Sequence, residues 1–134
     1  MKRLVILGVI VLVPLLVMLS VSTAMDKPQT EASLQGLEVA TLAGGCFWCT
    51  ESDFEKLDGV KEAISGYTGG HVENPTYKQV SRGGTGHIEA VQVYYDPKHI
   101  TYSQLLDHLW RHINPTDNGG QFVDRGDSYR PGIF

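Results

Sequence analysis

The sequence Gly44-Gly45-Cys46-Phe47-Trp48-Cys49-Thr50-Glu51 contains both cysteines of the 134-residue chain. The apolar residues 37–43 before it predict a strand, and residues 47–57 after it predict a helix that ends before Gly59. Cys46 therefore lies where a strand turns into a helix. The unpaired N–H groups and the positive dipole end of a helix favour a thiolate, so we expect Cys46 to be nucleophilic.

The residues around Cys46 distinguish a reactive thiol from an inert one. A buried cysteine commonly behaves as a small apolar residue. Here two preceding glycines allow a tight turn and leave the sulfur uncrowded. The aromatic pair Phe47-Trp48 and a second thiol, Cys49, follow directly. This arrangement favours a reactive site.

Residues 1–24 predict an export signal. They begin with the positive pair Lys2-Arg3, continue with the apolar run 4–19 and end with the small residues 22–24. The apolar run is shorter than the roughly 20 residues that span a bilayer, which favours a cleaved signal over a membrane anchor. We therefore expect a protein that is exported (periplasmic or extracellular) or membrane-tethered, with residues 25–36 as a linker and residues 37–134 as one domain.

The composition limits the partners and the metal chemistry. The formal net charge is −4 at pH 7, and an acidic domain lacks the basic surface that nucleic-acid binding requires. A structural zinc site needs four ligands, and the histidines are too scattered to complete one around the two cysteines. His108 and His112 could share a metal, but a solvated helix face is the simpler interpretation. We therefore predict neither a metal site nor a nucleic-acid partner.

The rest of the chain alternates between predicted strands and helices, which indicates a layered α and β fold. A capping box at Thr101 and an apolar stripe with Leu105, Leu109 and Ile113 mark the clearest helix. We expect that whole stripe, with the neighbouring Leu106 and Trp110, to be core. The predicted elements are strands over 60–67 and 87–95, helices over 76–82 and 101–113, a long polar loop over 116–128 and a short strand within 129–134.

Glu89 is the candidate proton donor. In the strand 87–95 it shares a face with Val91 and Val93. If that face packs against helices, burial raises the pKa of the carboxyl and lets it act as a general acid near neutral pH. Alternatively, Glu89 lies at an exposed strand end and is solvated. The pattern leaves both possibilities open.

Five motifs, in order and in register, resemble those of the type A peptide methionine sulfoxide reductases. The similarity extends from about Leu37 to the last residue. It implies an α/β (α+β) two-layer sandwich, with a mixed sheet and flanking helices arranged as a ferredoxin-like plait. The motifs are Gly44-Gly45-Cys46-Phe47-Trp48, Gly66-Tyr67-Thr68-Gly69-Gly70, Asn74-Pro75-Thr76-Tyr77, Thr85-Gly86-His87-Ile88-Glu89-Ala90-Val91 with Tyr95-Asp96-Pro97, and Asp124-Arg125-Gly126-Asp127-Ser128-Tyr129-Arg130.

The resemblance implies thiol-dependent reduction of the S epimer of methionine sulfoxide, free or in proteins, and hence repair of oxidised proteins. Cys46 would attack the sulfoxide sulfur and become a sulfenic acid. Phe47 and Trp48 would form an apolar pocket for the methyl group. We expect a monomer without a bound cofactor, recharged by an external thioredoxin-type dithiol.

The resemblance also implies roles for four polar residues. Glu89 would protonate the sulfoxide oxygen, and Tyr77 and Tyr129 would donate hydrogen bonds to it. Asp124 would support the site through its own hydrogen bonds.

The sequence departs from the family pattern in two places. The position of Cys49 varies among relatives, whose second, resolving cysteine commonly lies near the C-terminus. We favour Cys49 as the resolving thiol here. The alternative is direct attack by an external thiol, because a disulfide across two helical residues could be strained. Relatives also continue beyond Ile133-Phe134, so we expect the C-terminal part of the domain to be missing.

Two other functions are compatible with parts of the sequence. A CxxC pair after a strand is also typical of thioredoxin-like disulfide oxidoreductases, but that reading leaves the other four motifs unexplained. A catalytically inactive remnant that still binds the sulfoxide would fit the shortened chain. We favour the reductase over both.

Overall fold

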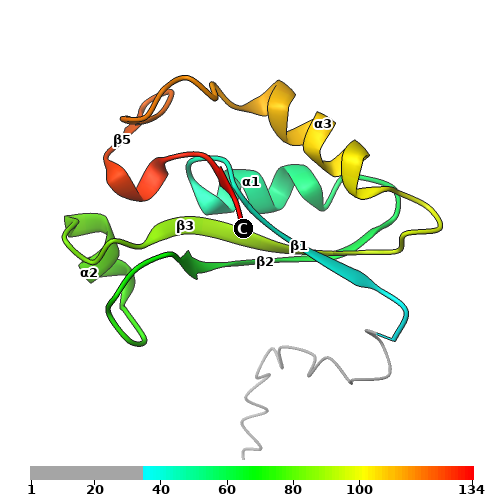
Figure 1. Cartoon of the computed structure of the whole chain (residues 1–134), viewed down its shortest axis with the longest axis horizontal. Helices are drawn as coiled ribbons and strands as arrows, with labels where there is room; N and C mark the ends of the chain where they lie inside the picture. Colours follow the sequence, from blue (N-terminus) through cyan, green and yellow to red (C-terminus); the bar gives the residue numbers. More distant parts are fainter. Residues whose placement is uncertain (1–34) are drawn as a thin grey trace, which may run out of the picture.

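A four-stranded sheet forms the centre of the computed structural model, which describes residues 35–134. Helices α1 and α3 cover one face of this sheet (Figure 1). The order along the chain is β-α-β-β-α-β, with a short helix added, which is the ferredoxin-like arrangement. The two-layer sandwich and the plait are thus confirmed. The elements are β1 (Glu38–Ala43), α1 (Phe47–Phe54), β2 (Val60–Thr68), α2 (Tyr77–Arg82), β3 (Ile88–Tyr95), α3 (Tyr102–His112) and β6 (Gly132–Ile133).

The strands lie in the order β2-β3-β1-β6, and every described pairing between them is antiparallel. The expectation of a mixed sheet is therefore wrong for this part of the chain. The reason lies in the topology. β1 and β2 run in the same direction and are joined through α1, but β3 inserts between them, so these two parallel strands are never neighbours.

The expected export signal (residues 1–24) and most of the linker lie outside the described residues. Within residues 35–134, no helix is both long enough and apolar enough to cross a membrane.

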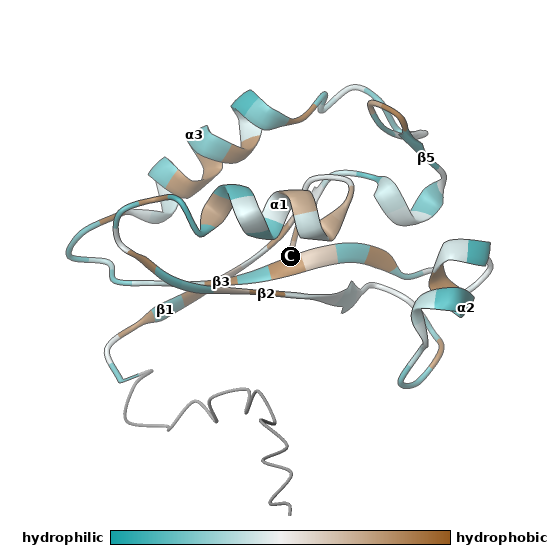
Figure 2. Ribbon diagram, turned by 180° about the vertical axis from the view of Figure 1, so that it is seen from behind, coloured by the Kyte–Doolittle hydropathy of each residue, from teal (hydrophilic) through white to brown (hydrophobic). Residues whose placement is uncertain are grey.

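The two faces of the sheet differ in their cover. On β3, Glu89, Val91 and Val93 are buried, whereas Gln92 on the opposite face is exposed. The apolar side of α3 is turned toward the sheet, and its hydrophilic side is turned outward (Figure 2). Leu105 and Leu109 of that side are fully buried. The core therefore lies between the helices and one face of the sheet.

Two details of the predicted helices are corrected. Helix α1 ends at Phe54 rather than at Leu57, because the chain turns there and the Leu57 N–H bonds to the Phe54 carbonyl. Leu57 still packs against the core. Trp110 was expected in the core but is 46% exposed. It follows Leu109 by about 100° around the helix, which turns it out of the buried stripe.

The predicted loop over 116–128 contains short elements that the sequence did not indicate. They are β4 (Gly120–Gln121), β5 (Asp124–Arg125) and the 3-10 helix η2 (Asp127–Tyr129). Arg125 closes this segment with two bonds to Asp117, of 2.7 and 3.0 Å, and this pairing lowers the pKa of Asp117 to about 2. The segment extends beyond the end of α3 and returns toward the start of α1 (Figure 1).

Candidate active site

Cys46 is the N-cap residue of α1, as the strand-to-helix turn predicted. The turn requires glycine at position 45, where φ is +99°. A Cβ atom at Gly45 would lie 2.8 Å from the Cβ of Gln121. The Thr50 N–H donates to the Cys46 carbonyl (3.1 Å) and closes the first turn of the helix.

Glu89 reaches the start of α1 from β3. Its Oε2 accepts a hydrogen bond of 3.0 Å from the Phe47 N–H, one of the donors that a helix N-terminus leaves free. Only 1% of the residue is exposed, and its Oε1 has no hydrogen-bond partner among the described residues. Burial raises the pKa of Glu89, the Phe47 N–H opposes this and the Asp124 charge adds to it. The buried alternative for Glu89 is therefore the correct one.

Three aromatic rings form a wall beside Cys46. The Phe47 and Trp48 ring centroids lie 5.4 Å apart, and Trp48 stacks on Tyr77 at 6.1 Å with an interplanar angle of 11°. Phe47 is buried, while 64% of Trp48 and 49% of Tyr77 are exposed. The structure thus brings together three predicted site residues from two helices, and the wall they form opens to solvent.

Tyr129 and Asp124 lie on η2 and β5, and Tyr129 reaches Tyr77 of the aromatic wall through a hydrogen bond. The pKa of Tyr129 is raised to about 12, mainly by burial and then by the charge of Glu89. Tyr77, through its charge and a hydrogen bond, and the charge of Asp124 raise it further. Its hydroxyl therefore keeps its proton at neutral pH and can donate it in a hydrogen bond. All of the predicted polar residues, from four separate segments, converge near the start of α1.

Tyr67 is a further site residue that the sequence did not single out. It lies opposite Glu89 in the β2–β3 register, and its ring is 5.6 Å from that of Phe47. Burial, followed by the charge of Glu89 and by Tyr77, raises its pKa. The residue is part of a quoted motif, but only the strand register reveals that it faces Glu89.

Gln121 was also missed, and it links two parts of the site. It is 1% exposed. Its Oε1 accepts from the Asn114 N–H (2.6 Å), and its Nε2 donates to the carbonyls of Gly120 (2.7 Å) and Asn114 (3.0 Å). Because Gln121 also packs on Gly45, it connects the segment that carries Asp124 with the turn that carries Cys46.

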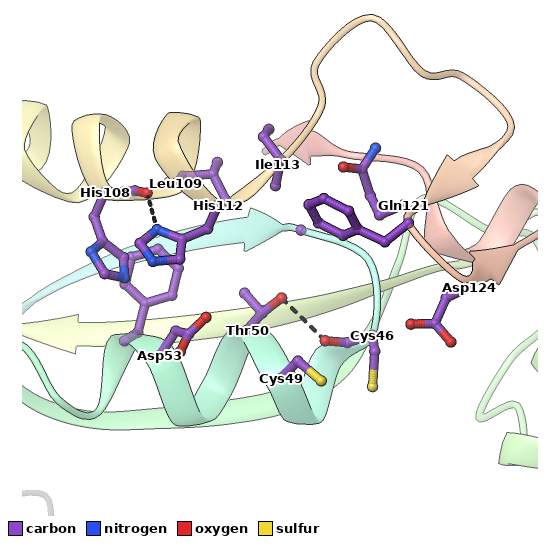
Figure 3. A pocket seen from close by; sticks show the side chains of 13 residues that line it. Cys46, Cys49, Thr50, Asp53, His108, Leu109, His112, Ile113, Gln121 and Asp124 are labelled. Atoms are coloured by element: carbon purple, nitrogen blue, oxygen red, sulfur yellow. Dashed lines mark hydrogen bonds between the residues drawn. The ribbon is translucent and has the colours of Figure 1, made fainter.

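Cys49 lies one helical turn after Cys46 and is exposed, and both are free thiols. Their sulfur atoms point to the same side of α1 (Figure 3). A hydrogen bond with Cys46 is the main cause that raises the pKa of Cys49, and burial adds to it. Cys49 therefore remains protonated at neutral pH.

His108 and His112 lie side by side on α3, with ring centroids 4.1 Å apart (Figure 3). One ring nitrogen of His112 bonds to the His108 carbonyl (2.7 Å). In the described part of the chain, no group of three or more histidine, cysteine, aspartate or glutamate side chains is arranged to hold a metal ion.

Comparison with known proteins identifies relatives of the whole described domain. The family model described as "Peptide methionine sulfoxide reductase" matches residues 38–134. The peptide methionine sulfoxide reductase MsrA/MsrB of Vibrio cholerae is 63% identical over 114 residues, which are 84% of this chain and 30% of that protein. MsrA of Listeria monocytogenes is 56% identical over 100 residues, 75% of this chain and 56% of that protein. The chain thus spans about half the length of the Listeria relative and less than a third of the Vibrio one.

Solved structures agree with these sequence relatives. Methionine sulfoxide reductase A of Corynebacterium diphtheriae matches with a TM-score of 0.73 and 35% identity, covering 75% of this chain and 47% of that one. Reduced Mxr1 of Saccharomyces cerevisiae matches with a TM-score of 0.69 and 37% identity, covering 74% of this chain and 59% of that one. The family match over nearly all the described residues and the shared fold show that the chain belongs to the peptide methionine sulfoxide reductase family.

Proposed function

We propose that this chain reduces the S epimer of methionine sulfoxide to methionine, with Cys46 as the nucleophile and Glu89 as the general acid. The observation that carries the proposal is the buried Glu89 carboxyl. It accepts a hydrogen bond from the N–H of Phe47, the residue that directly follows Cys46, and its second oxygen is unpaired among the described residues. A protonated acid beside a thiol matches the needs of sulfoxide reduction, because the sulfoxide oxygen is a poor leaving group until protonated.

In the first step, the Cys46 sulfur attacks the sulfoxide sulfur while the Glu89 proton passes to the sulfoxide oxygen. Tyr77 and Tyr129 donate hydrogen bonds to that oxygen, and Asp124 supports them. The new S–S bond and the S–O bond of the substrate then break as the hydroxyl group passes to the Cys46 sulfur, which leaves Cys46 as a sulfenic acid and releases methionine as the thioether. Phe47 and Trp48 hold the methyl group of the substrate.

Cys49 then resolves the sulfenic acid. Its thiol attacks the Cys46 sulfur, a disulfide forms and one molecule of water leaves. The proximity of the two sulfurs supports this step. An external thioredoxin-type dithiol would reduce the disulfide. Peptide mass mapping after one turnover is expected to find a Cys46–Cys49 disulfide, and Cys46 as a sulfenic acid beside a free Cys49 would contradict the step.

The enzyme would act outside the cytoplasm, as an exported or membrane-tethered monomer that meets oxidised envelope or secreted proteins. The positive and apolar start of the sequence supports this placement. Fractionation of cells that express the full chain tests it.

The decisive test compares the separate S and R sulfoxides of N-acetylmethionine, with dithiothreitol as the reductant. We expect the thioether product from the S epimer alone, and no product with Cys46→Ser. An insulin-reduction assay is the control, since a thioredoxin-like oxidoreductase would reduce insulin and leave both sulfoxides unchanged. A folded protein that binds the S sulfoxide without product would instead indicate the inactive remnant.

A further inference from the structure

A groove lies beside the reactive thiols, between α1 and the end of α3 (Figure 3). Its volume is about 140 Å³. Cys46, Cys49 and Asp124 border one end, and Asp53, His108 and His112 border the other. The aromatic residues Phe47, Trp48 and Tyr77 are not among its described lining residues, so the groove is separate from the wall proposed for the sulfoxide methyl group.

The lining of the groove includes an apolar part between its polar ends, with Thr50 and Gln121 as polar neighbours. Phe54, Leu109, Ile113 and Phe122 contribute to it. An apolar protein cavity of about 150 Å³ accommodates a benzene ring, so this groove can hold one aliphatic or aromatic side chain. It is too small for a second folded element.

Phe122 supplies a second, independent observation. Its φ is +50°, a conformation that is unusual for a bulky residue. The strained turn between β4 and β5 presents the ring at the groove with 70% of the residue exposed to water. A ligand that covers this ring removes apolar surface from water, and this burial stabilises the complex.

The position of Cys46 indicates which ligand the groove receives. Cys46 borders the groove and is also the proposed nucleophile. A side chain in the groove would therefore lie close to the methionine sulfoxide that Cys46 attacks and could belong to the same polypeptide. Seven residues of helix, from Cys46 to Asp53, rise about 10 Å, and an extended chain covers that distance in about three residues. A flexible polypeptide bound at Cys46 can therefore place a nearby side chain in the groove.

We propose that this groove binds an apolar side chain two or three residues away from the methionine sulfoxide in a flexible polypeptide. This rests on the proposed function and specifies its substrate class, namely peptide-bound sulfoxide with an apolar flanking residue. A folded reductant is the competing occupant. The folded reductant is disfavoured because the groove has room for only one side chain. A flexible polypeptide can extend such a side chain into the groove more readily than a folded surface can.

The test uses seven-residue peptides with a central methionine S-sulfoxide, in which a single leucine replaces serine at each of the other positions in turn. With dithiothreitol as the reductant, we expect kcat/KM to rise about tenfold for leucine at one position two or three residues from the sulfoxide. Phe122→Asn keeps a residue that tolerates positive φ and is expected to bring the leucine-to-serine ratio close to one. Val123→Asn is the matched control, since Val123 is 89% exposed and is not among the groove's described residues.

Fluorescence anisotropy of the same peptides, labelled and bound to the Cys46→Ser variant, measures the preference for leucine over serine without turnover. Equal affinity for all peptides, or equal loss of the preference in both loop variants, would overturn the proposal. The proposal would also be overturned if Phe122→Asn lowered activity only when thioredoxin is the reductant. That result would assign the groove to the reductant. A wild-type chain that does not reduce N-acetylmethionine S-sulfoxide contradicts the proposed function, whereas the anisotropy preference tests the groove separately.

Discussion

The N-termini of α1 and α3 are satisfied in different ways. At α3, the Thr101 side chain accepts from the Gln104 N–H (3.3 Å), and the Gln104 side chain accepts from the Thr101 N–H (2.8 Å). At α1, the N-cap Cys46 makes no such side-chain bond among the described residues, and the Phe47 N–H donates to Glu89, 42 residues away. One cap is local, and the other is provided by the tertiary fold.

This difference separates stability from chemistry. A local cap stabilises its helix by about 1 kcal/mol wherever the helix packs. The cap of α1 forms only when the sheet has formed, but it holds a buried carboxyl at the backbone of Phe47, the residue after Cys46. The Glu51 carboxylate on α1, which accepts from the Ser65 N–H of β2 (2.8 Å), adds a second tertiary tie. The N-terminus of helix α1 thus depends on the fold to hold the candidate catalytic groups in place.

The largest expected effect comes from Glu89→Gln. Glutamine keeps an oxygen for the Phe47 N–H but supplies no acidic proton, so kcat is expected to fall by about 10²- to 10⁴-fold. Steady-state kinetics with the S sulfoxide measure this, and circular dichroism should show an unchanged fold. Activity within tenfold of the wild type would remove Glu89 from the role of acid.

The next effect concerns Gln121, which joins the two sides of the site. Gln121→Ala leaves the buried Asn114 N–H without its partner and opens space beside Gly45, so we expect a loss of about 1 to 3 kcal/mol in the free energy of unfolding. Urea denaturation measures it. Gln121→Glu, which keeps the acceptor but not the donor, is the matched variant. A stability equal to that of the wild type for both variants would show that the link is unimportant.

A third prediction concerns the pH dependence of stability that the Glu89 cap of α1 introduces. Because the pKa of Glu89 is raised by folding, the folded chain holds this proton more tightly than the unfolded chain. This contribution to stability is full below the unfolded pKa and is lost as the pH rises through the folded pKa. Glu89→Gln should therefore lose less stability than the wild type as the pH rises above about 4.3, the ordinary pKa of a glutamate in an unfolded chain, and parallel curves in urea titrations would contradict this.

The smallest expected effect is at α3. Thr101→Ala removes a local cap and should lower the free energy of unfolding by about 1 kcal/mol, seen as a decrease in Tm of roughly 4 to 8 °C for a domain of this size. Its kcat should equal that of the wild type, and Thr101→Ser should restore the stability. A large loss of kcat would show that the two helix ends are not independent.

Local patterns predicted most elements and the turn at Cys46. The periodicity of Leu105 and Leu109 gave the α3 core stripe, and alternation gave the two faces of β3. Trp110 was misplaced because a stripe seen in sequence has no sharp edge. The antiparallel sheet could not be read locally, because the insertion of β3 between β1 and β2 depends on long-range pairing.

The candidate site was predictable where a residue lies in a motif, and less so elsewhere. Strand alternation does not say which end of a strand is covered, so the sequence alone does not decide whether Glu89 is buried. The sequence does not indicate that Gln121 is buried, because a polar residue in a glycine-rich loop is expected to be exposed. Its side chain is buried because it forms hydrogen bonds with the backbone of Asn114 and Gly120. Tyr67 required the β2–β3 register.

The convergence of the site from distant segments has a consequence for biosynthesis. Cys46 precedes Tyr129 by about 80 residues, and ribosomes add roughly 5 to 20 residues per second. Cys46, the proposed nucleophile, therefore emerges several seconds before the segment that carries Asp124 and Tyr129. During that interval the nascent chain carries two thiols without Asp124 and Tyr129, so the fold cannot confine the chemistry of those thiols until residues 124–129 have been added.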